Sequence, residues 1–269
     1  MTPRAVREAA LRWHATARSA IVVEVLTARG SVPRDAGTRM LVAADEVLGT
    51  IGGGHLELQA IATARHLLAE GGAPQDQAVA LGPSLGQCCG GALTLRFTAL
   101  AACSPPQWPL PPVLFNLQLY GAGHVGRAIV NLLGGIDCRV RWIDEREDEF
   151  PSAPLPVHIE PVCTDSVQAE VAHAAPGACY LVLTHSHDLD LVISHAILAR
   201  ADFGFFGLIG SQTKRARFEH RLAERGIAPA TLARMVCPIG LPGLHGKQPE
   251  VLAVSVVAQL LMQPLLQGH

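Results

Sequence analysis

A single glycine-rich turn restricts the possible folds of this chain more than any other feature. Gly121, Gly123 and Gly126 form the pattern G-x-G-x-x-G between an apolar stretch at 113–120 and an amphipathic stretch at 124–133. The first glycine permits a tight turn, the second lets the backbone approach a phosphate, and the third lets helix and strand pack closely. The pattern therefore predicts a strand that passes directly into a helix, as in dinucleotide-binding sheets.

Two further residues favour a ligand at this turn. His124 opens the predicted helix, whose first N–H groups would be available to an anion. Asp144 ends the next predicted strand, at about the 20-residue spacing at which an acidic side chain binds a ribose hydroxyl. The same turn could also be kept for its geometry and hold no dinucleotide, because a fold does not determine its ligand.

The chain is predicted to have two domains of different architecture. Residues 114–269 alternate strictly between strand and helix patterns, which favours a Rossmann-like parallel sheet covered by helices on both faces. Residues 1–102 mix short strands with two helices in no regular alternation and are predicted to form a mixed α+β domain. Residues 103–113 carry five prolines and are predicted to be a stiff linker. The fold class is therefore α/β, with a mixed N-terminal domain.

Individual elements follow from periodicity and from glycine and proline positions. Helices are predicted at 4–17, 55–72, 124–133, 166–174, 188–200, 212–226 and from about 248 onward. Strands are predicted at 20–30, 38–43, 46–53, 77–81, 91–100, 113–121, 137–145, 158–162, 179–185 and 203–211.

Composition excludes several classes of protein. The net charge is -2, which favours neither a nucleic-acid partner nor a polybasic membrane clamp. No apolar run is long enough to cross a membrane, and the first twenty residues lack a secretory apolar core, so a cytoplasmic location with reduced thiols is expected. Only 16% of residues are charged and 49% are hydrophobic, which leaves apolar surface and favours self-association or a stable partner.

The segment "THSHDLD" follows a predicted strand at the edge where open α/β sheets bind ligands. Alternate His185 and His187 with nearby carboxylates could bind zinc or iron, as in a metal-dependent hydrolase. The segment approaches the H-x-H-x-D-H pattern of such enzymes but places Leu189 and Asp190 at its last two positions. It could instead be a polar loop that faces a cofactor, or a helix start capped by Asp188.

A basic helix start offers a second candidate anion site. Lys214 and Arg215 follow Ser211, which can cap the predicted helix. Cations at this end oppose the helix dipole, an arrangement that is favourable when an anion binds there. The alternative is a solvated basic face.

The first half contains two glycine loops. Gly52, Gly53 and Gly54 precede His55 at the start of a predicted helix, where backbone N–H groups could meet a ligand. Gln87 precedes the adjacent thiols Cys88 and Cys89, which lie between glycines. A thiol there could be a nucleophile or a ligand for a soft metal, and both could equally be small buried side chains.

Taken together, these segments resemble the XdhC/CoxI family of molybdenum-hydroxylase maturation factors. The similarity runs through "ARGSVPRDAGTRMLV", "GTIGGGHLE" and "GQCCGG", then "LYGAGHVG", "VLTHSHDLDL", "FGLIGSQTKRARF" and "CPIGLPG". The ordered set is far more specific than the glycine turn alone. The resemblance would also place an acidic residue near Gln259, which this chain lacks.

The resemblance implies a cofactor chaperone rather than a catalyst. Such a protein binds the molybdenum cofactor (molybdopterin), shields it while a cysteine desulfurase sulfurates it, and inserts it into the molybdenum-binding subunit of xanthine dehydrogenase. The cofactor-binding candidates are then the residues of both glycine loops, the turn at Gly121, Asp144, the two histidines and the basic pair, with no catalytic residue and no separate metal site. The alternative is an NAD(P)-dependent oxidoreductase built on the Gly121 turn.

Overall fold

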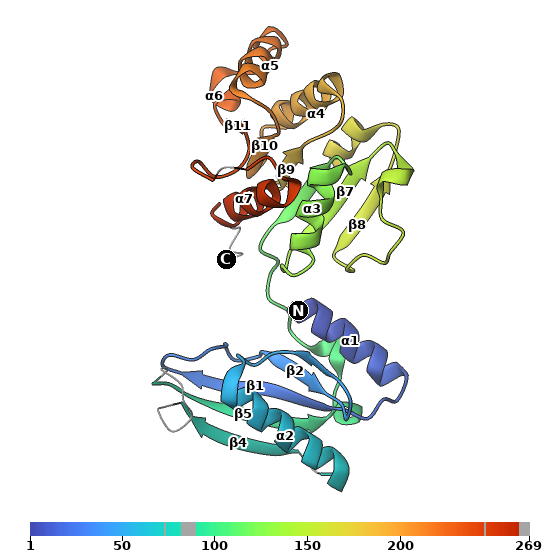
Figure 1. Ribbon diagram of the computed structural model, residues 1–269, viewed down its shortest axis with the longest axis vertical. Coiled ribbons are helices and arrows are strands. Elements are labelled where there is room, and N and C mark those ends of the chain that lie inside the picture. The colour runs from blue at the N-terminus through green and yellow to red at the C-terminus, as the bar shows by residue number, and fades with distance from the viewer. Residues whose placement is uncertain (73, 82–89, 245, 264–269) are drawn as a thin grey trace. The chain divides into compact units, whose positions relative to one another are not determined.

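The structure, a computed structural model, describes residues 1–72, 74–81, 90–244 and 246–263. The chain forms two compact units, Met1–Pro111 and Pro112–His269 (Figure 1). Most of the segment predicted as a linker belongs to the first unit. Trp108 packs against its core, while the side chains of Arg4 and Arg7 donate hydrogen bonds to the carbonyl oxygens of Pro111 and Trp108, respectively. These contacts hold the proline-rich segment against the N-terminal helix.

The first unit is an antiparallel sheet in the order β3-β2-β1-β5-β4. Its elements are α1 (Pro3–Ala15), β1 (Ile21–Arg29), β2 (Arg39–Val42), β3 (Val47–Gly49), α2 (Gly54–Glu70), β4 (Gln75–Ala80), β5 (Ala92–Ala99) and the 3-10 helices η2 (Leu100–Ala102) and η3 (Pro105–Gln107).

Alternation along β1 gives this sheet two buried faces. Ile21 and Val23 pack against α2, whereas Val22 packs in the core that contains Trp13 of α1. Successive strand side chains point to opposite faces, so one strand serves both cores. The unit therefore has three layers, with one helix over each face of the sheet.

The second unit is a parallel sheet in the order β8-β7-β6-β9-β10-β11. Its strands are β6 (Asn116–Tyr120), β7 (Arg139–Asp144), β8 (Ile159–Cys163), β9 (Cys179–Val182), β10 (Phe205–Leu208) and β11 (Met235–Val236). Its helices are α3 (His124–Leu133), α4 (His187–Arg200), α5 (Gln212–Glu224), α6 (Pro229–Leu232) and α7 (Pro249–Leu261), with the 3-10 helices η4 (Glu147–Glu149) and η5 (Val167–His173).

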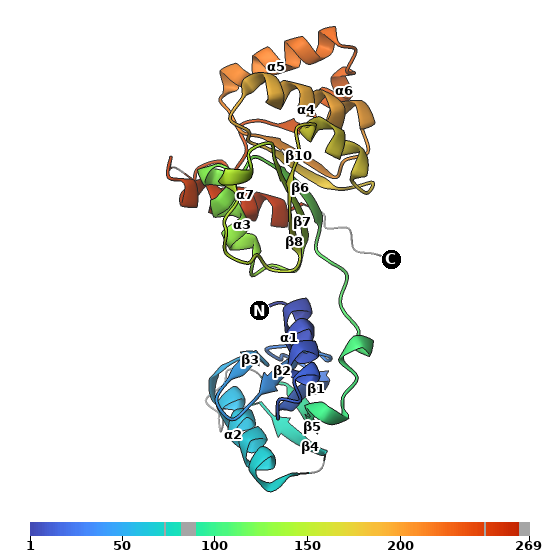
Figure 2. The same ribbon diagram turned by 90° about the vertical axis from the view of Figure 1, so that its right-hand side faces the viewer.

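Numbered within the unit, this strand order is 3-2-1-4-5-6, the order of dinucleotide-binding sheets. Leu119 of β6 pairs with Trp142 of β7 on one side and with Leu181 of β9 on the other. Helices α3 and α7 share one core with one face of the sheet (Figure 2), and α4 and α5 share the core of the opposite face. The α/β fold class predicted for this half is confirmed.

Two elements differ from the sequence-based prediction. The predicted helix at 166–174 is the 3-10 helix η5, in which the N–H of Ala169 donates to the carbonyl of Ser166. Only Val167 and Val171 of this segment are buried, so few apolar contacts stabilise an α-helix there. Strand β11 was not predicted because two residues are too few to show a periodic pattern.

In the described ranges, none of the helices is both long enough and apolar enough to span a lipid bilayer.

Candidate functional site

The carboxyl edge of the parallel sheet contains a topological switch point. Strands β6 and β9 are neighbours, but the chain leaves β6 for α3 and leaves β9 for α4, on opposite faces of the sheet. Open α/β sheets bind ligands in the crevice that forms where connections diverge in this way. The Gly121 turn and the segment at His185 follow these two strands, as the sequence predicted.

The glycines of the β6–α3 turn have different roles. A Cβ atom at Gly126 would lie 2.1 Å from the carbonyl oxygen of Gly121, so this glycine is required for helix–strand packing. A Cβ atom at Gly123 would have no neighbour within 4 Å. Gly123 is also the N-cap of α3 and supplies no side-chain hydrogen bond to the helix start, where His124 is exposed. The turn therefore has room and backbone donors for an anionic group.

Asp144 joins the glycine turn to the end of β7. One carboxylate oxygen accepts from the backbone N–H of Ala122 at 2.7 Å, and Arg146 donates from its side chain to both oxygens at 2.9 Å. Burial alone would raise the pKa of Asp144, but the hydrogen bonds from Arg146 and Ala122 outweigh it and hold the pKa below its usual range. A ribose hydroxyl at this position would meet a carboxylate that already has several donors.

The two histidines of "THSHDLD" lie in different environments. Nε2 of His185 is 3.5 Å from a carboxylate oxygen of Glu145. His187 begins α4 and lines a cavity of about 310 Å³ with Lys214 and Arg217. The cap of α4 is Ser186, whose hydroxyl accepts from the N–H of Leu189 at 3.4 Å, so the cap predicted at Asp188 is wrong. Among the residues described, no three His, Cys, Asp or Glu side chains cluster as metal ligands would.

Lys214 forms a buried ion pair instead of an open anion site. Its Nζ donates to the carboxylate of Asp190 at 2.6 Å and to the carbonyl of Ile209 at 2.8 Å. The Asp190 side chain is fully buried, and its other oxygen accepts from both the backbone N–H and the hydroxyl of Thr184. Sequence reasoning missed this pairing. The signal available to it was the acidic residue one turn into a largely apolar helix.

Arg215 is also engaged. Its guanidinium donates to Glu219 at 2.8 Å, one turn further along α5, and to the carbonyl of Cys237 at 3.4 Å. Burial raises the pKa of the Cys237 thiol, which is therefore protonated at neutral pH. Lys214 and Arg215 at the helix start are thus both paired with other residues of the fold, whereas Arg217 of the same helix is exposed.

In the first unit, the glycine turn before α2 closes around a carboxylate. Gly52, Gly53 and Gly54 all have positive φ. One oxygen of Glu57 accepts from the N–H groups of Ile51 at 2.9 Å and Gly53 at 3.1 Å, and from the hydroxyl of Thr50 at 2.5 Å. The carboxylate of Glu57 therefore binds some of the backbone N–H groups that the sequence analysis expected to meet a ligand.

Two other residues predicted for this turn, His55 and Gly52, lie in different surroundings. The exposed His55 has its Nε2 atom 2.9 Å from the amide nitrogen of Gln59. A Cβ atom at Gly52 would lie 2.5 Å from Cβ of Pro33, so the turn is packed against the β1–β2 loop. Gln87, Cys88 and Cys89 lie outside the described residues.

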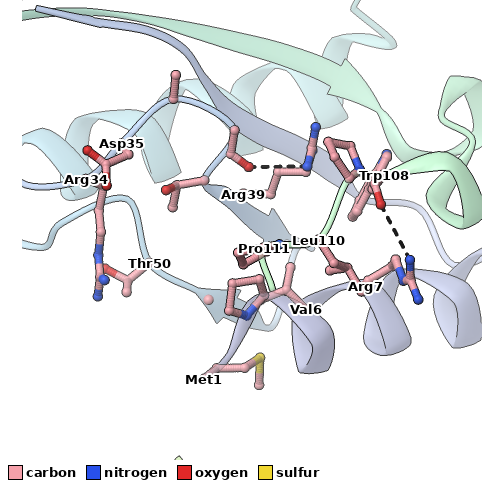
Figure 3. Close-up of a pocket in the computed structure, with 16 residues that line it drawn as sticks. Met1, Val6, Arg7, Arg34, Asp35, Arg39, Thr50, Trp108, Leu110 and Pro111 are labelled. Carbon is pink, nitrogen blue, oxygen red and sulfur yellow. Dashed lines mark hydrogen bonds between the residues drawn. The ribbon is translucent and has the colours of Figure 1, made fainter. Parts of the chain in front are cut away.

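The first unit also contains a cavity of about 470 Å³, here called the arginine pocket (Figure 3). It is formed by the start of α1, the β1–β2 loop, the end of β3 and the proline-rich segment. Its lining residues are Met1, Pro3, Val6, Arg7, Arg34, Asp35, Ala36, Gly37, Thr38, Arg39, Gly49, Thr50, Trp108, Pro109, Leu110 and Pro111. None of these residues was singled out as a ligand from the sequence, because they come from four separate segments.

Comparison with known proteins connects both units to one family. Residues 117–260 match the model of the XdhC Rossmann domain, and residues 13–77 match that of the XdhC and CoxI family. The chain belongs to the XdhC and CoxI family. The family resemblance stated from the sequence is confirmed, and in this XdhC-family protein the two matches fall within different units.

Two known proteins are similar to this chain. The uncharacterized protein YqeB of Escherichia coli K12 is 30% identical over 256 residues, which are 89% of this chain and 42% of YqeB. The chain thus spans about two fifths of the length of that relative. A crystal structure described as a xanthine dehydrogenase from Bacillus halodurans has a TM-score of 0.70 and 18% identity, covering 97% of this chain and 95% of the other. At that identity the match shows a shared fold.

Proposed function

We propose that this protein is a maturation factor for a molybdenum-containing xanthine dehydrogenase. In this proposal it binds the molybdenum cofactor, shields it while a cysteine desulfurase sulfurates it, and passes it to the molybdenum-binding subunit of the enzyme. The observation that carries the proposal is the family match in both units, which includes the Gly52–Gly54 turn and the Gly121 turn. We further propose that it acts in the cytoplasm as a homodimer.

The residues present fit an anionic pterin ligand. Molybdopterin carries a phosphate, and phosphates bind to helix starts and to guanidinium groups. Each unit by itself offers such groups: the second has open space at Gly123 at the start of α3, and the first has the exposed Arg34 in the arginine pocket. Bound cofactor would supply the molybdenum centre, while the chain itself would bind the phosphate and exclude water from the metal. Cys88 and Cys89 remain the proposed thiol contacts.

The proposal is tested by purifying the protein from a host that makes molybdopterin and oxidising any bound pterin to its fluorescent form. We expect about one phosphorylated pterin per protomer, and less in a Cys88→Ala/Cys89→Ala double variant. Protein from the same host with its molybdopterin synthesis disabled is the control. Absence of pterin, together with normal activation of the dehydrogenase by the double variant, would overturn the proposal.

An NAD(P)-dependent oxidoreductase is a second candidate, favoured by the strand order and by the space at Gly123. Against it, Arg146 already donates hydrogen bonds to both oxygens of the Asp144 carboxylate, which would have to bind the ribose. Calorimetric titration with NADH separates the two functions, because micromolar binding with turnover would support the oxidoreductase. Stoichiometric zinc in elemental analysis would instead favour a metal-dependent hydrolase.

A further inference from the structure

We propose that the arginine pocket of the first unit binds the phosphate of a planar heterocyclic ligand. The inference rests on the proposed function in that a pterin phosphate is the ligand expected there. It goes further because it assigns the phosphate to residues outside both glycine turns. A nucleoside monophosphate has the same chemistry and is a second possible source of the ligand.

The pocket has an excess of positive charge. Three guanidinium groups line it, those of Arg7, Arg34 and Arg39, against the single carboxylate of Asp35. The charge of Arg39 is balanced by Glu24, whose carboxylate lies 2.5 Å away. The other two guanidinium groups have no carboxylate partner within the described part of the chain, so the pocket can bind an anion without first breaking an ion pair.

Two arginine side chains of the pocket have N–H donors without acceptors. The Nε atom of Arg7 is buried and makes no hydrogen bond to any described residue, while Nη1 of the same side chain donates to the Trp108 carbonyl at 3.5 Å. The guanidinium of Arg34 is exposed and makes no hydrogen bond or ion pair to the residues that the structure describes. The Nε of Arg7 is shielded from solvent, so the exposed guanidinium of Arg34 is the donor group that remains open to an anion in the pocket.

The guanidinium groups lie on either side of an apolar floor. Figure 3 shows Arg34 beside Thr50 on one side of the pocket and Arg7 beside Trp108 on the other. The labelled side chains between them are Val6, Leu110 and Pro111, with Arg39 above them in the view. An apolar floor favours a flat, weakly polar ring system, and it lowers the local dielectric constant, which strengthens the attraction between a guanidinium and a phosphate.

Size and rigidity agree with this assignment. A volume of about 470 Å³ falls within the range of small-molecule sites, roughly 300–1,000 Å³. The wall at Trp108 is held in place, because the guanidinium of Arg39 lies 4.9 Å above its ring and is itself anchored by Glu24. The pocket is therefore formed before a ligand arrives, apart from the free side chain of Arg34.

The test uses the full chain, purified from a host that makes no molybdopterin. Calorimetry measures binding of three probes: the oxidised phosphorylated pterin released from a molybdoenzyme, its dephosphorylated form, and adenosine monophosphate. The variants are Arg34→Gln, Arg34→Lys and, as a matched control, Arg12→Gln, which removes an exposed arginine of α1 that does not line the pocket. Unchanged melting temperatures establish that each variant is folded.

We expect Arg34→Gln to weaken binding of the phosphorylated pterin about tenfold or more and Arg34→Lys to retain part of the affinity. Arg12→Gln should change this affinity less than about twofold. The dephosphorylated pterin should be insensitive to all three substitutions. If Arg34→Gln binds the phosphorylated pterin as tightly as the wild type, the pocket assignment is overturned while the proposed function stands. If only adenosine monophosphate binds, and Arg34→Gln abolishes it, the pocket stands and the proposed pterin ligand is wrong. If the wild type binds none of the probes, the pocket assignment is overturned, and the pterin content of the purified protein decides the proposed function separately.

Discussion

At the scale of single residues, different glycines of the β6–α3 turn serve helix–strand packing and ligand approach. The turn needs Gly126 because the helix lies against the carbonyl of Gly121, and it leaves Gly123 facing empty space. Gly123 has a φ of -67°, which any residue can adopt. Two glycines of one motif therefore respond differently to the same added methyl group.

We expect Gly126→Ala to lower the free energy of unfolding by about 1–3 kcal/mol, because the new Cβ atom must displace backbone. Gly123→Ala should change the free energy of unfolding by less than about 0.5 kcal/mol, yet weaken the binding of any anion at the helix start. Urea denaturation of both variants measures the difference. Equal stabilities for the two variants would show that the packing account of the turn is wrong.

The contacts of Asp144 predict a dependence of stability on pH. Its pKa is lower in the folded protein than the value of about 3.9 in an unfolded chain. The carboxylate therefore stabilises the fold fully above that value, and the contribution is lost as the pH falls through the folded pKa. At pH 7, Asp144→Asn should cost about 1.5–3 kcal/mol, the range for hydrogen bonds to a charged group.

This cost should shrink as the pH is lowered below about 4, because the wild-type carboxyl group then takes up a proton. Chemical denaturation at a series of pH values measures it. Asp165→Asn, at an exposed aspartate in the same unit, is the control and should show no such trend. A cost for Asp144→Asn that stays constant from pH 7 to pH 3 would contradict the assignment.

At the scale of elements, the Lys214–Asp190 pair connects the start of α5 to the β9–α4 connection. Both side chains are largely buried, at 10% and 0% exposed. Removing the lysine leaves a buried, uncompensated carboxylate, so Lys214→Met should cost about 3–5 kcal/mol in the free energy of unfolding.

The matched control is Arg217→Gln, which removes an exposed cation from the same helix and should change stability by less than about 0.5 kcal/mol. The double variant Lys214→Met/Asp190→Asn should recover part of the loss, because it removes the unpaired charge. Denaturation curves for the three proteins provide the comparison. If Lys214→Met were as stable as Arg217→Gln, the ion pair would have no structural role.

The elements that sequence predicted best are those specified by local signals. Helix α3 spans His124–Leu133, the predicted range, because a glycine turn begins it and its apolar residues have helical spacing. Helix α2 ends before Gly71, which has a left-handed conformation, as a helix-terminating glycine should. The segment at η5 lacked such signals, and its periodic pattern alone predicted the wrong type of helix.

The candidate site was less predictable because its side chains are paired through the tertiary fold. The sequence places Lys214 at a helix start but does not show that Asp190, on another helix, reaches it. It places the Gly52–Gly54 turn correctly before α2 but does not show that Glu57 folds back onto it. The arginine pocket is formed by four separate segments of the first unit, so no local sequence pattern predicts it.

At the scale of the whole molecule, the chain consists of two units with separate cores. The cores of the first unit contain only residues before Leu114, and those of the second contain only residues after Val113. We therefore expect fragments 1–111 and 112–269, expressed separately, each to unfold cooperatively in calorimetry. A fragment 112–269 without a cooperative transition would show that its fold depends on the first unit.

Delivery of the molybdenum cofactor to a dehydrogenase is the proposed role of the whole molecule. The most direct measurement is the activity regained by xanthine dehydrogenase purified without its cofactor, after addition of the pterin-bound protein and a cysteine desulfurase. We predict that activity rises in proportion to the pterin delivered, and that the ligand-free protein gives none. If free cofactor with the desulfurase restores the same activity at the same rate with or without this protein, the claim is contradicted.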